Sequence, residues 1–163
     1  VTGLLNFAPV IQGQVDATAA TDTGLYVGKL KGLGDVNVIN VKDSLNVPSD
    51  MFVVTSEYYQ ANKVLLGRFL TAYRDSVAWM IAQPEEAARI AIDRSINGRN
   101  ESVNLDIIKL RNISSQSKTT ETRGLGHFDL DVLQLGADAY LAHGLIKSKL
   151  KMSQVIKSDL IPE

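Results

Sequence analysis

The stretch IQGQVDATAATDTGLYVGKL, residues 11–30, decides the fold that we expect. Apolar and small side chains at residues 15–20 predict a short buried strand. Thr21 or Asp22 then offers a side-chain oxygen that caps a helix, and we expect this helix to run to the end of the stretch. The stretch therefore predicts a strand followed directly by a helix. Residues 17–22 are also unusual, because most of their side chains are too small to fill a core.

Two further strands are predicted downstream. DVNVINV at residues 35–41 alternates with period two, and MFVVT at residues 51–55 is rich in strand-favouring side chains. Beyond them the pattern is helical, and the strongest predicted helix covers residues 63–83. Strands in the first third and helices after them predict an α/β fold with a mostly parallel sheet. The apolar residues of the long helix share one stripe, which we expect to be core: Leu66, Phe69, Leu70, Tyr73, Val77, Met80 and Ile81.

Composition excludes several classes of protein. The chain has 163 residues, of which 45% are hydrophobic and 21% charged, and this profile is typical of a globular protein. A net charge of −1 argues against a nucleic-acid partner, because binding phosphates requires clustered positive charge. The absence of cysteine excludes disulfides, thiolate metal sites and cysteine nucleophiles. The chain begins with Val1 rather than methionine, so we expect a processed chain or a piece of a longer one.

No catalytic constellation is found. Neither GLG triplet follows a strand and opens a helix as a dinucleotide-binding loop does, and no nucleophile elbow G-x-S-x-G occurs. His127 lies beside Asp129 and Asp131, but a loop histidine that caps the next helix is the simpler interpretation. His143 is best explained as a cation at a helix C-terminus. We therefore expect no catalytic residue, no metal and no cofactor.

Four segments together resemble the solute-binding proteins of bacterial ABC importers. More narrowly, they are similar to the group that binds taurine, alkanesulfonates, nitrate and thiamine precursors. The resemblance depends on the order and spacing of the segments, since each alone is short. The segments are IQGQVDATAATDT, VPSDMFVVTSEYYQAN, VLLGRFLTAYRDSVAWMIAQPEEAARI and GHFDLDVLQLGADAYLAHGLIKSKL.

The resemblance implies a two-lobed, type II periplasmic-binding-protein fold of which this chain is a C-terminal part. Residues 1–50 would be the second half of lobe 2, and residues 51–163 the crossover strand and C-terminal helices that complete lobe 1. The implied function is non-catalytic binding of a small polar or anionic solute between the lobes. The implied partners are an ABC permease in the membrane and either the missing N-terminal half or a second copy of the chain. No nucleic-acid partner is expected. The implied location is periplasmic or otherwise extracytoplasmic.

The resemblance also answers the question of the small residues. It implies that Ala20, Thr21 and Asp22, with Thr18, line the ligand cleft, where small side chains leave room for a solute. The backbone N–H groups at the helix N-terminus would hold an anionic or polar head group. Asp22 would favour a ligand with a cationic or donor group. The alternative is that residues 17–20 pack tightly under a helix.

The implied hinge comprises Ser49, Asp50, Met51 and Phe52, where the chain crosses between the lobes. Two other functions share the same scaffold. One is the ligand-sensing domain of a regulator. The other is a thiamine-pyrimidine synthase that uses its own histidine and a pyridoxal phosphate lysine. The synthase is disfavoured because both histidines lie in the C-terminal helical part and the small-residue segment holds no lysine.

Overall fold

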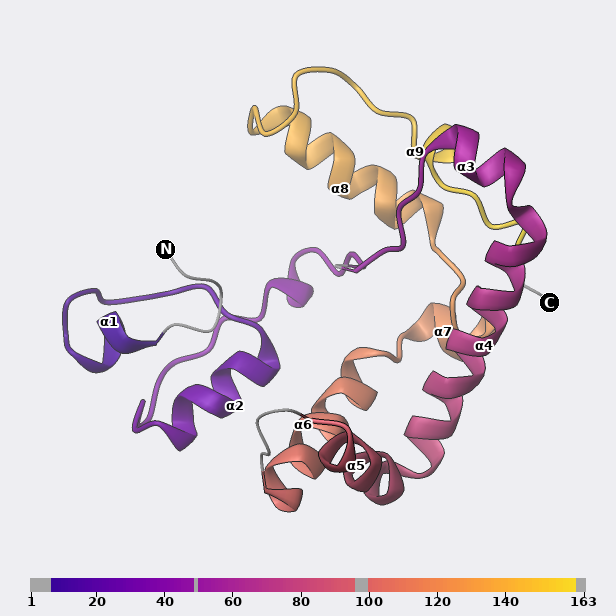
Figure 1. The fold of residues 1–163 in the computed structure, drawn as a ribbon. Helices are drawn as coiled ribbons and strands as arrows, with labels where there is room; N and C mark the ends of the chain where they lie inside the picture. The colour runs from indigo at the N-terminus through magenta and orange to yellow at the C-terminus, as the bar shows by residue number, and fades with distance from the viewer. Residues whose placement is uncertain (1–6, 49, 96–99, 161–163) are drawn as a thin grey trace. The chain divides into compact units, whose positions relative to one another are not determined.

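The structure, a computed structural model, describes residues 7–48, 50–95 and 100–160. Figure 1 shows helices joined by irregular segments. In chain order the described elements are α1 (Ala8–Ile11), α2 (Asp22–Leu30), the short 3₁₀ helix η1 (Val41–Asp43), α3 (Ser56–Ala61), α4 (Lys63–Ala82), α5 (Pro84–Asp93), α6 (Glu101–Ser114), α7 (Lys118–Arg123), α8 (Leu130–Ala142) and α9 (Met152–Val155).

The prediction of an α/β fold with a mostly parallel sheet is wrong, because the described residues form helices and no strand. Residues 15–20 and 51–55 are irregular, and residues 35–41 are irregular up to the start of η1. A strand is stable only when a neighbour takes up its backbone N–H and C=O groups. These three segments have the composition of strands, but they do not pair with one another. The large apolar side chains of these segments are exposed to solvent; Ile39, for example, is 93% exposed.

The chain divides into two compact units. Unit 1 combines Val1–Val38 with Met80–Ser115, and unit 2 combines Ile39–Trp79 with Gln116–Glu163. Each unit is therefore built from two separate stretches of the chain. The division into lobes at residue 50 stays a prediction.

The α5–α6 hairpin supplies the core of unit 1. Pro84 opens α5 at a position where its missing N–H costs nothing, and acidic side chains follow in the first turn. Ala88 is fully buried, and its small side chain lets α6 approach closely. The buried members of this core are Ala87, Ala88 and Ile108, with Met80 and Leu105 packed against them.

Helix α2 also belongs to unit 1, and it has the predicted bounds and cap. It runs from Asp22 to Leu30 and is capped by Thr21. Phe7 is buried and lies so close to Gly28 that a Cβ atom at Gly28 would be 2.7 Å from the Phe7 ring. Glycine at this position therefore allows the ring to pack on the helix.

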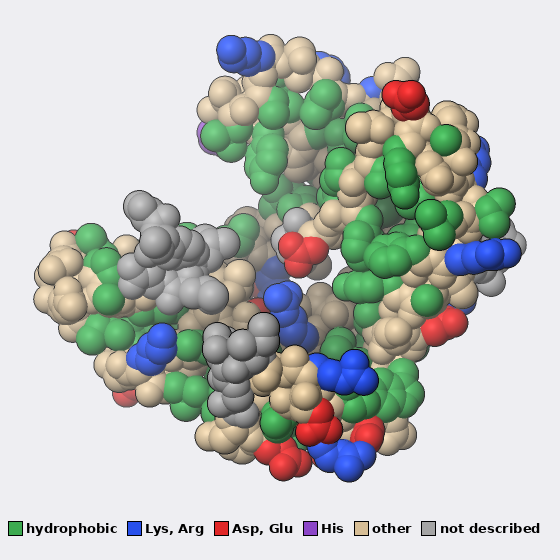
Figure 2. Space-filling model, in the orientation of Figure 1, with side chains coloured by type: hydrophobic (Ala, Val, Ile, Leu, Met, Phe, Trp, Pro, Cys, Tyr) green, Lys and Arg blue, Asp and Glu red, His purple; other side chains and the backbone are tan. Residues whose placement is uncertain are grey.

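Helix α4, which belongs to unit 2 up to Trp79, confirms the predicted helix but not its predicted core stripe. None of its residues is buried, and the side chains of Phe69 and Tyr73 are 48% and 52% exposed. Figure 2 shows hydrophobic side chains gathered on the surface in the region of α3 and α4. The periodicity predicted the helix correctly, but burial also depends on what packs against the stripe.

A second small core holds α8 and α9 together within unit 2. Leu133 and Ala137 of α8 are buried against Met152 of α9, with Phe128 and Ile156 beside them. Asp129 caps α8 by accepting hydrogen bonds from the backbone N–H groups of residues 131 and 132. This carboxylate therefore satisfies two donors at the start of the helix.

Candidate functional site

The small-residue segment lies open to solvent and enters α2 from an extended backbone. Residues 17–22 are all exposed, so they do not pack tightly beneath a helix in the part of the chain that is described. Thr18 donates a long hydrogen bond of 3.5 Å to the carbonyl oxygen of Ala19. The Ala20 side chain offers only a methyl group. The segment thus lies open to solvent before the first turn of α2.

Side chains already occupy the first N–H groups of α2. The Thr21 hydroxyl oxygen accepts from the Gly24 amide at 3.1 Å, and Asp22 Oδ1 accepts from the Thr23 amide at 2.7 Å. The Leu25 amide donates to the Thr21 carbonyl oxygen at 2.8 Å. An anion at this terminus would have to displace the helix's own cap and approach the Asp22 carboxylate. The expected anion cradle of free amides is therefore not seen at these three positions.

Helix α6 holds the same end of α2 through two polar contacts. The Ser114 hydroxyl donates to Asp22 Oδ2. One turn further along α2, the Tyr26 hydroxyl donates to Asp106 Oδ2 at 2.6 Å. This bond to a carboxylate, together with partial burial, raises the pKa of Tyr26 above its ordinary value. The contacts position the Asp22 carboxylate relative to a helix far away in the sequence.

The structure thus brings together part of the expected site. Thr21 and Asp22 lie at the α2 terminus, and their partners are Thr23 and Ser114. Ala20 and Thr18 precede them in the exposed segment. Sequence reasoning missed Ser114, and no local signal marks it, because its role depends on packing between α2 and α6.

Of the expected hinge residues, Ser49 lies outside the described part of the chain. Asp50, Met51 and Phe52 are exposed and irregular. The Phe52 ring meets Phe69 and Tyr73 of α4 edge-to-face, with ring centres 5.1 and 4.9 Å apart. These contacts tie the end of the expected hinge to α4. The hinge itself stays a prediction.

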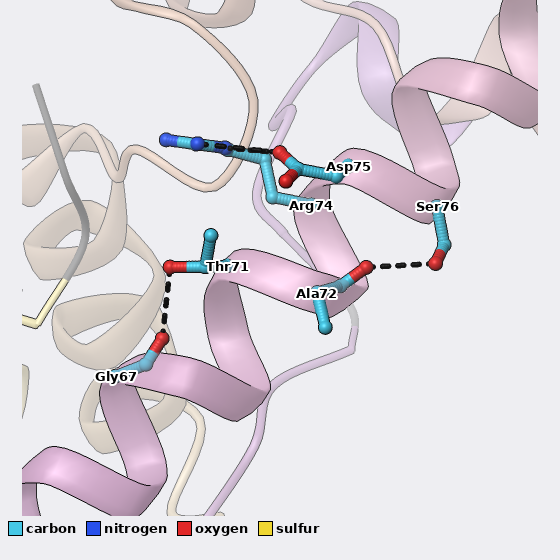
Figure 3. Close-up of polar contacts among 6 residues, drawn as sticks. All are labelled: Gly67, Thr71, Ala72, Arg74, Asp75 and Ser76. Atoms are coloured by element: carbon cyan, nitrogen blue, oxygen red, sulfur yellow. Dashed lines mark hydrogen bonds and ion pairs between the residues drawn. The ribbon is translucent and has the colours of Figure 1, made fainter.

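A shallow groove of about 600 Å³ runs along α4 in unit 2. Figure 3 shows that polar groups here are turned to their own helix. The Thr71 hydroxyl donates to the Gly67 carbonyl oxygen at 2.9 Å, and Arg74 pairs with Asp75 at 3.2 Å. The groove therefore presents few polar groups that converge on a solute. Its lining residues are Val64, Gly67, Arg68, Thr71, Ala72, Asp75, Asp159 and Leu160.

The two histidines lie in unit 2. His143 is the exposed C-cap residue of α8, so it lies at the helix C-terminus as the sequence predicted. His127 lies in the loop between α7 and α8, where its Nδ1 atom is buried without a hydrogen-bond partner among the described residues. Neither geometry shows a nucleophile–base pair.

In the described part of the chain, none of the helices has the length and apolar character needed to cross a membrane.

The comparisons with known proteins give a match to a family model. The curated proteins and the solved structures contain no match to this sequence. A family model described as NMT1/THI5 like matches residues 1–87, which is more than half of the 163 residues and includes the small-residue segment and α2. The match supports the resemblance to solute-binding proteins broadly, without selecting the taurine or nitrate group. The chain belongs to the NMT1/THI5-like family.

Proposed function

We propose that the chain is part of the substrate-binding component of an ABC-type importer and that it binds a small polar solute without catalysis. The observation that carries the proposal is that the family match covers an exposed small-residue segment leading into a polar helix end. The open segment supplies space, and the carboxylate and hydroxyl groups of Asp22 and Thr21 supply polar contacts. In this role the chain works outside the cytoplasm and delivers its solute to a membrane permease.

The chemistry of the α2 terminus favours a solute that carries a hydrogen-bond donor. The amides of Thr23 and Gly24 already have acceptors, so they do not attract a further anion. The Asp22 carboxylate is exposed and accepts from donors. An amino group on the solute would therefore be bound better than a sulfonate or nitrate alone.

A thermal-shift experiment with a matched pair of solutes tests this proposal. Taurine and ethanesulfonate share a sulfonate, but only taurine carries an ammonium group. A thiamine-precursor pyrimidine with an amino group and nitrate complete the panel. A bound solute at 100 times its Kd stabilises the chain by about 2.7 kcal/mol, which a melting curve detects. We expect an amino-bearing solute to stabilise the chain and nitrate to have no effect.

The Asp22→Asn variant is the control for the same experiment. It keeps the shape of the side chain and removes its charge, so the stabilisation by an amino-bearing solute should fall while the fold is unchanged. Stabilisation by ethanesulfonate or nitrate alone would contradict the proposed solute chemistry. Covalent attachment of pyridoxal phosphate to a lysine, seen by mass spectrometry, would indicate the synthase instead of a binding protein.

A further inference from the structure

The C-terminal segment, residues 150–160, is fastened to α8 of unit 2 by a side-chain amide. Gln134 donates from Nε2 to the Leu150 carbonyl oxygen at 2.9 Å, and its Oε1 accepts from the Met152 amide at 3.0 Å. The side-chain amide of Gln134 thus bonds the backbone on both sides of Lys151, as a neighbouring strand would. This contact fixes where the segment enters its path.

The same end of the segment is also anchored by apolar packing. Met152 is buried at 9% exposure against Leu133 and Ala137, and Ile156 packs on the same cluster. Two backbone hydrogen bonds order this part: Gln154 to Lys151 at 2.9 Å and Ile156 to Met152 at 2.8 Å. This anchor depends little on charge.

The far end is held by exposed polar contacts to α3 and α4. Asp159 accepts from the Tyr59 hydroxyl through Oδ1, and its Oδ2 lies 3.3 Å from Lys63 Nζ. Lys63 Nζ also lies 4.9 Å from the centre of the Tyr59 ring. The side chains of Lys63 and Asp159 are 43% and 54% exposed, so solvent competes for this ion pair.

Asp159 supplies a charge that α4 lacks. The helix begins with Lys63, a cation at the positive end of the helix dipole, and its first turn contains no acidic residue. The Asp159 carboxylate compensates both charges from a position almost a hundred residues later in the chain. Loss of this contact would leave the start of α4 with uncompensated positive charge and Tyr59 without its acceptor.

We propose that residues 150–160 form a C-terminal strap that opens from its Asp159 end while its Met152 end stays packed. The two ends differ in kind, since one depends on exposed charge and the other on buried apolar surface. Opening exposes Tyr59, which is buried in the fastened state, and removes Asp159 and Leu160 from the wall of the groove along α4. The strap is thus a detachable cover for the α3–α4 junction.

Limited digestion with trypsin tests the strap, because Lys151 and Lys157 mark its two ends. Proteolysis under conditions where opening is fast reports the population of the open form. In the Asp159→Asn variant we expect cleavage after Lys157 to accelerate about tenfold, while cleavage after Lys151 keeps its rate. In Met152→Ala, cleavage should accelerate at both sites. Products are identified by mass spectrometry.

Asp75→Asn is the matched control, since it removes an exposed carboxylate of α4 that pairs with Arg74 and not with the strap. Tyr59→Phe removes one of the two bonds to Asp159 and should give a smaller acceleration after Lys157. The proposal is overturned if trypsin cleaves Asp159→Asn after Lys157 no faster than it cleaves Asp75→Asn there. Equal acceleration at both lysines in Asp159→Asn would overturn it as well. Circular dichroism establishes that each variant remains helical.

Discussion

Ser114 donates a hydrogen bond to the Asp22 carboxylate across a separation of 92 residues in the sequence. The bond joins the last residue of α6 to the first residue of α2. Together with Tyr26–Asp106, it sets where the end of α2 lies on α6. The geometry of the candidate site therefore depends on α6, which holds α2 through Ser114 and Asp106.

Replacing Ser114 with alanine should disturb the site more than it disturbs the fold. Water replaces the lost donor because both side chains are exposed, so we expect the free energy of unfolding to fall by about 1 kcal/mol or less. Binding of an amino-bearing solute should weaken because the Asp22 carboxylate loses its orienting contact. Ser115→Ala is the control, since the Ser115 hydroxyl donates to the Arg111 carbonyl oxygen of its own helix. Equal solute affinity in the two variants would show that Ser114 does not position Asp22.

Two glycines in helices should respond to alanine with opposite signs. A Cβ at Gly28 would come within 2.7 Å of the buried Phe7 ring, whereas a Cβ at Gly67 would meet only the Leu160 carbonyl oxygen at 3.9 Å. Alanine gains about 1 kcal/mol over glycine in a helix, and overpacking costs about 1–3 kcal/mol. Gly67→Ala should therefore stabilise the chain, and Gly28→Ala should destabilise it in urea unfolding. Stabilisation by both would mean that Phe7 does not pack on α2.

The hairpin core of unit 1 can be tested within one helix. Ile108 is 9% exposed and packs against Ala87 and Ala88, whereas Ile113 of the same helix is 66% exposed. Ile108→Ala should lower the free energy of unfolding by about 2–4 kcal/mol, because it leaves a cavity between α5 and α6. Ile113→Ala should change it by no more than about 0.5 kcal/mol. Similar costs at the two positions in chemical denaturation would contradict this packing.

The contact between Tyr59, Lys63 and Asp159 predicts a pH window for the strap. Hydrogen bonding to Tyr59 and then to Lys63 lowers the pKa of Asp159 below its ordinary 3.8, although burial opposes the shift. The hydrogen bond that Tyr59 donates to Asp159 raises the pKa of Tyr59 above 10.0. The hydrogen bond from Lys63 to the same carboxylate raises the pKa of Lys63 above 10.5. An acid whose pKa is lowered in the folded state stabilises that state above its unfolded pKa and loses this contribution as the pH falls through its folded pKa. A tyrosine or lysine whose pKa is raised stabilises the folded state below its unfolded pKa and loses this contribution as the pH rises through its folded pKa. The Asp159 end should stay fastened between about pH 4 and pH 10 and open on either side.

Tyrosinate absorbance measures this prediction directly. Asp159→Asn should bring the pKa of Tyr59 back toward its ordinary value, because the carboxylate is the largest cause of the shift. The Tyr26 hydroxyl, which bonds to Asp106, provides an internal comparison that this variant leaves unchanged. An unaltered titration of Tyr59 in Asp159→Asn would show that the two groups are not bonded in solution.

Local signals predicted α2, α4 and α5. Thr21 marked the cap of α2, and Pro84 marked the start of α5, because a cap or a proline acts within one turn of the chain. The period of the apolar residues predicted α4, but it did not predict that Phe69 and Tyr73 would be exposed. Periodicity describes one side chain relative to the next, whereas burial requires a partner surface.

The failures of prediction all concern partners that are distant in the sequence. Residues 51–55 have strand composition, but composition does not show whether another strand lies beside them. Ser114 and Asp159 carry no local pattern, because their roles come from contacts with Asp22 and with Tyr59. The candidate site could therefore be predicted at its α2 end and not at its α6 end.

Amide hydrogen exchange of residues 17–24 tests the central claim most directly. The chain is measured alone and with taurine, an amino-bearing thiamine-precursor pyrimidine, ethanesulfonate and nitrate. We predict that taurine or the pyrimidine slows exchange in this segment and that Asp22→Asn abolishes the slowing. No protection from any of the four solutes, or protection confined to other parts of the chain, would contradict solute binding at the α2 terminus.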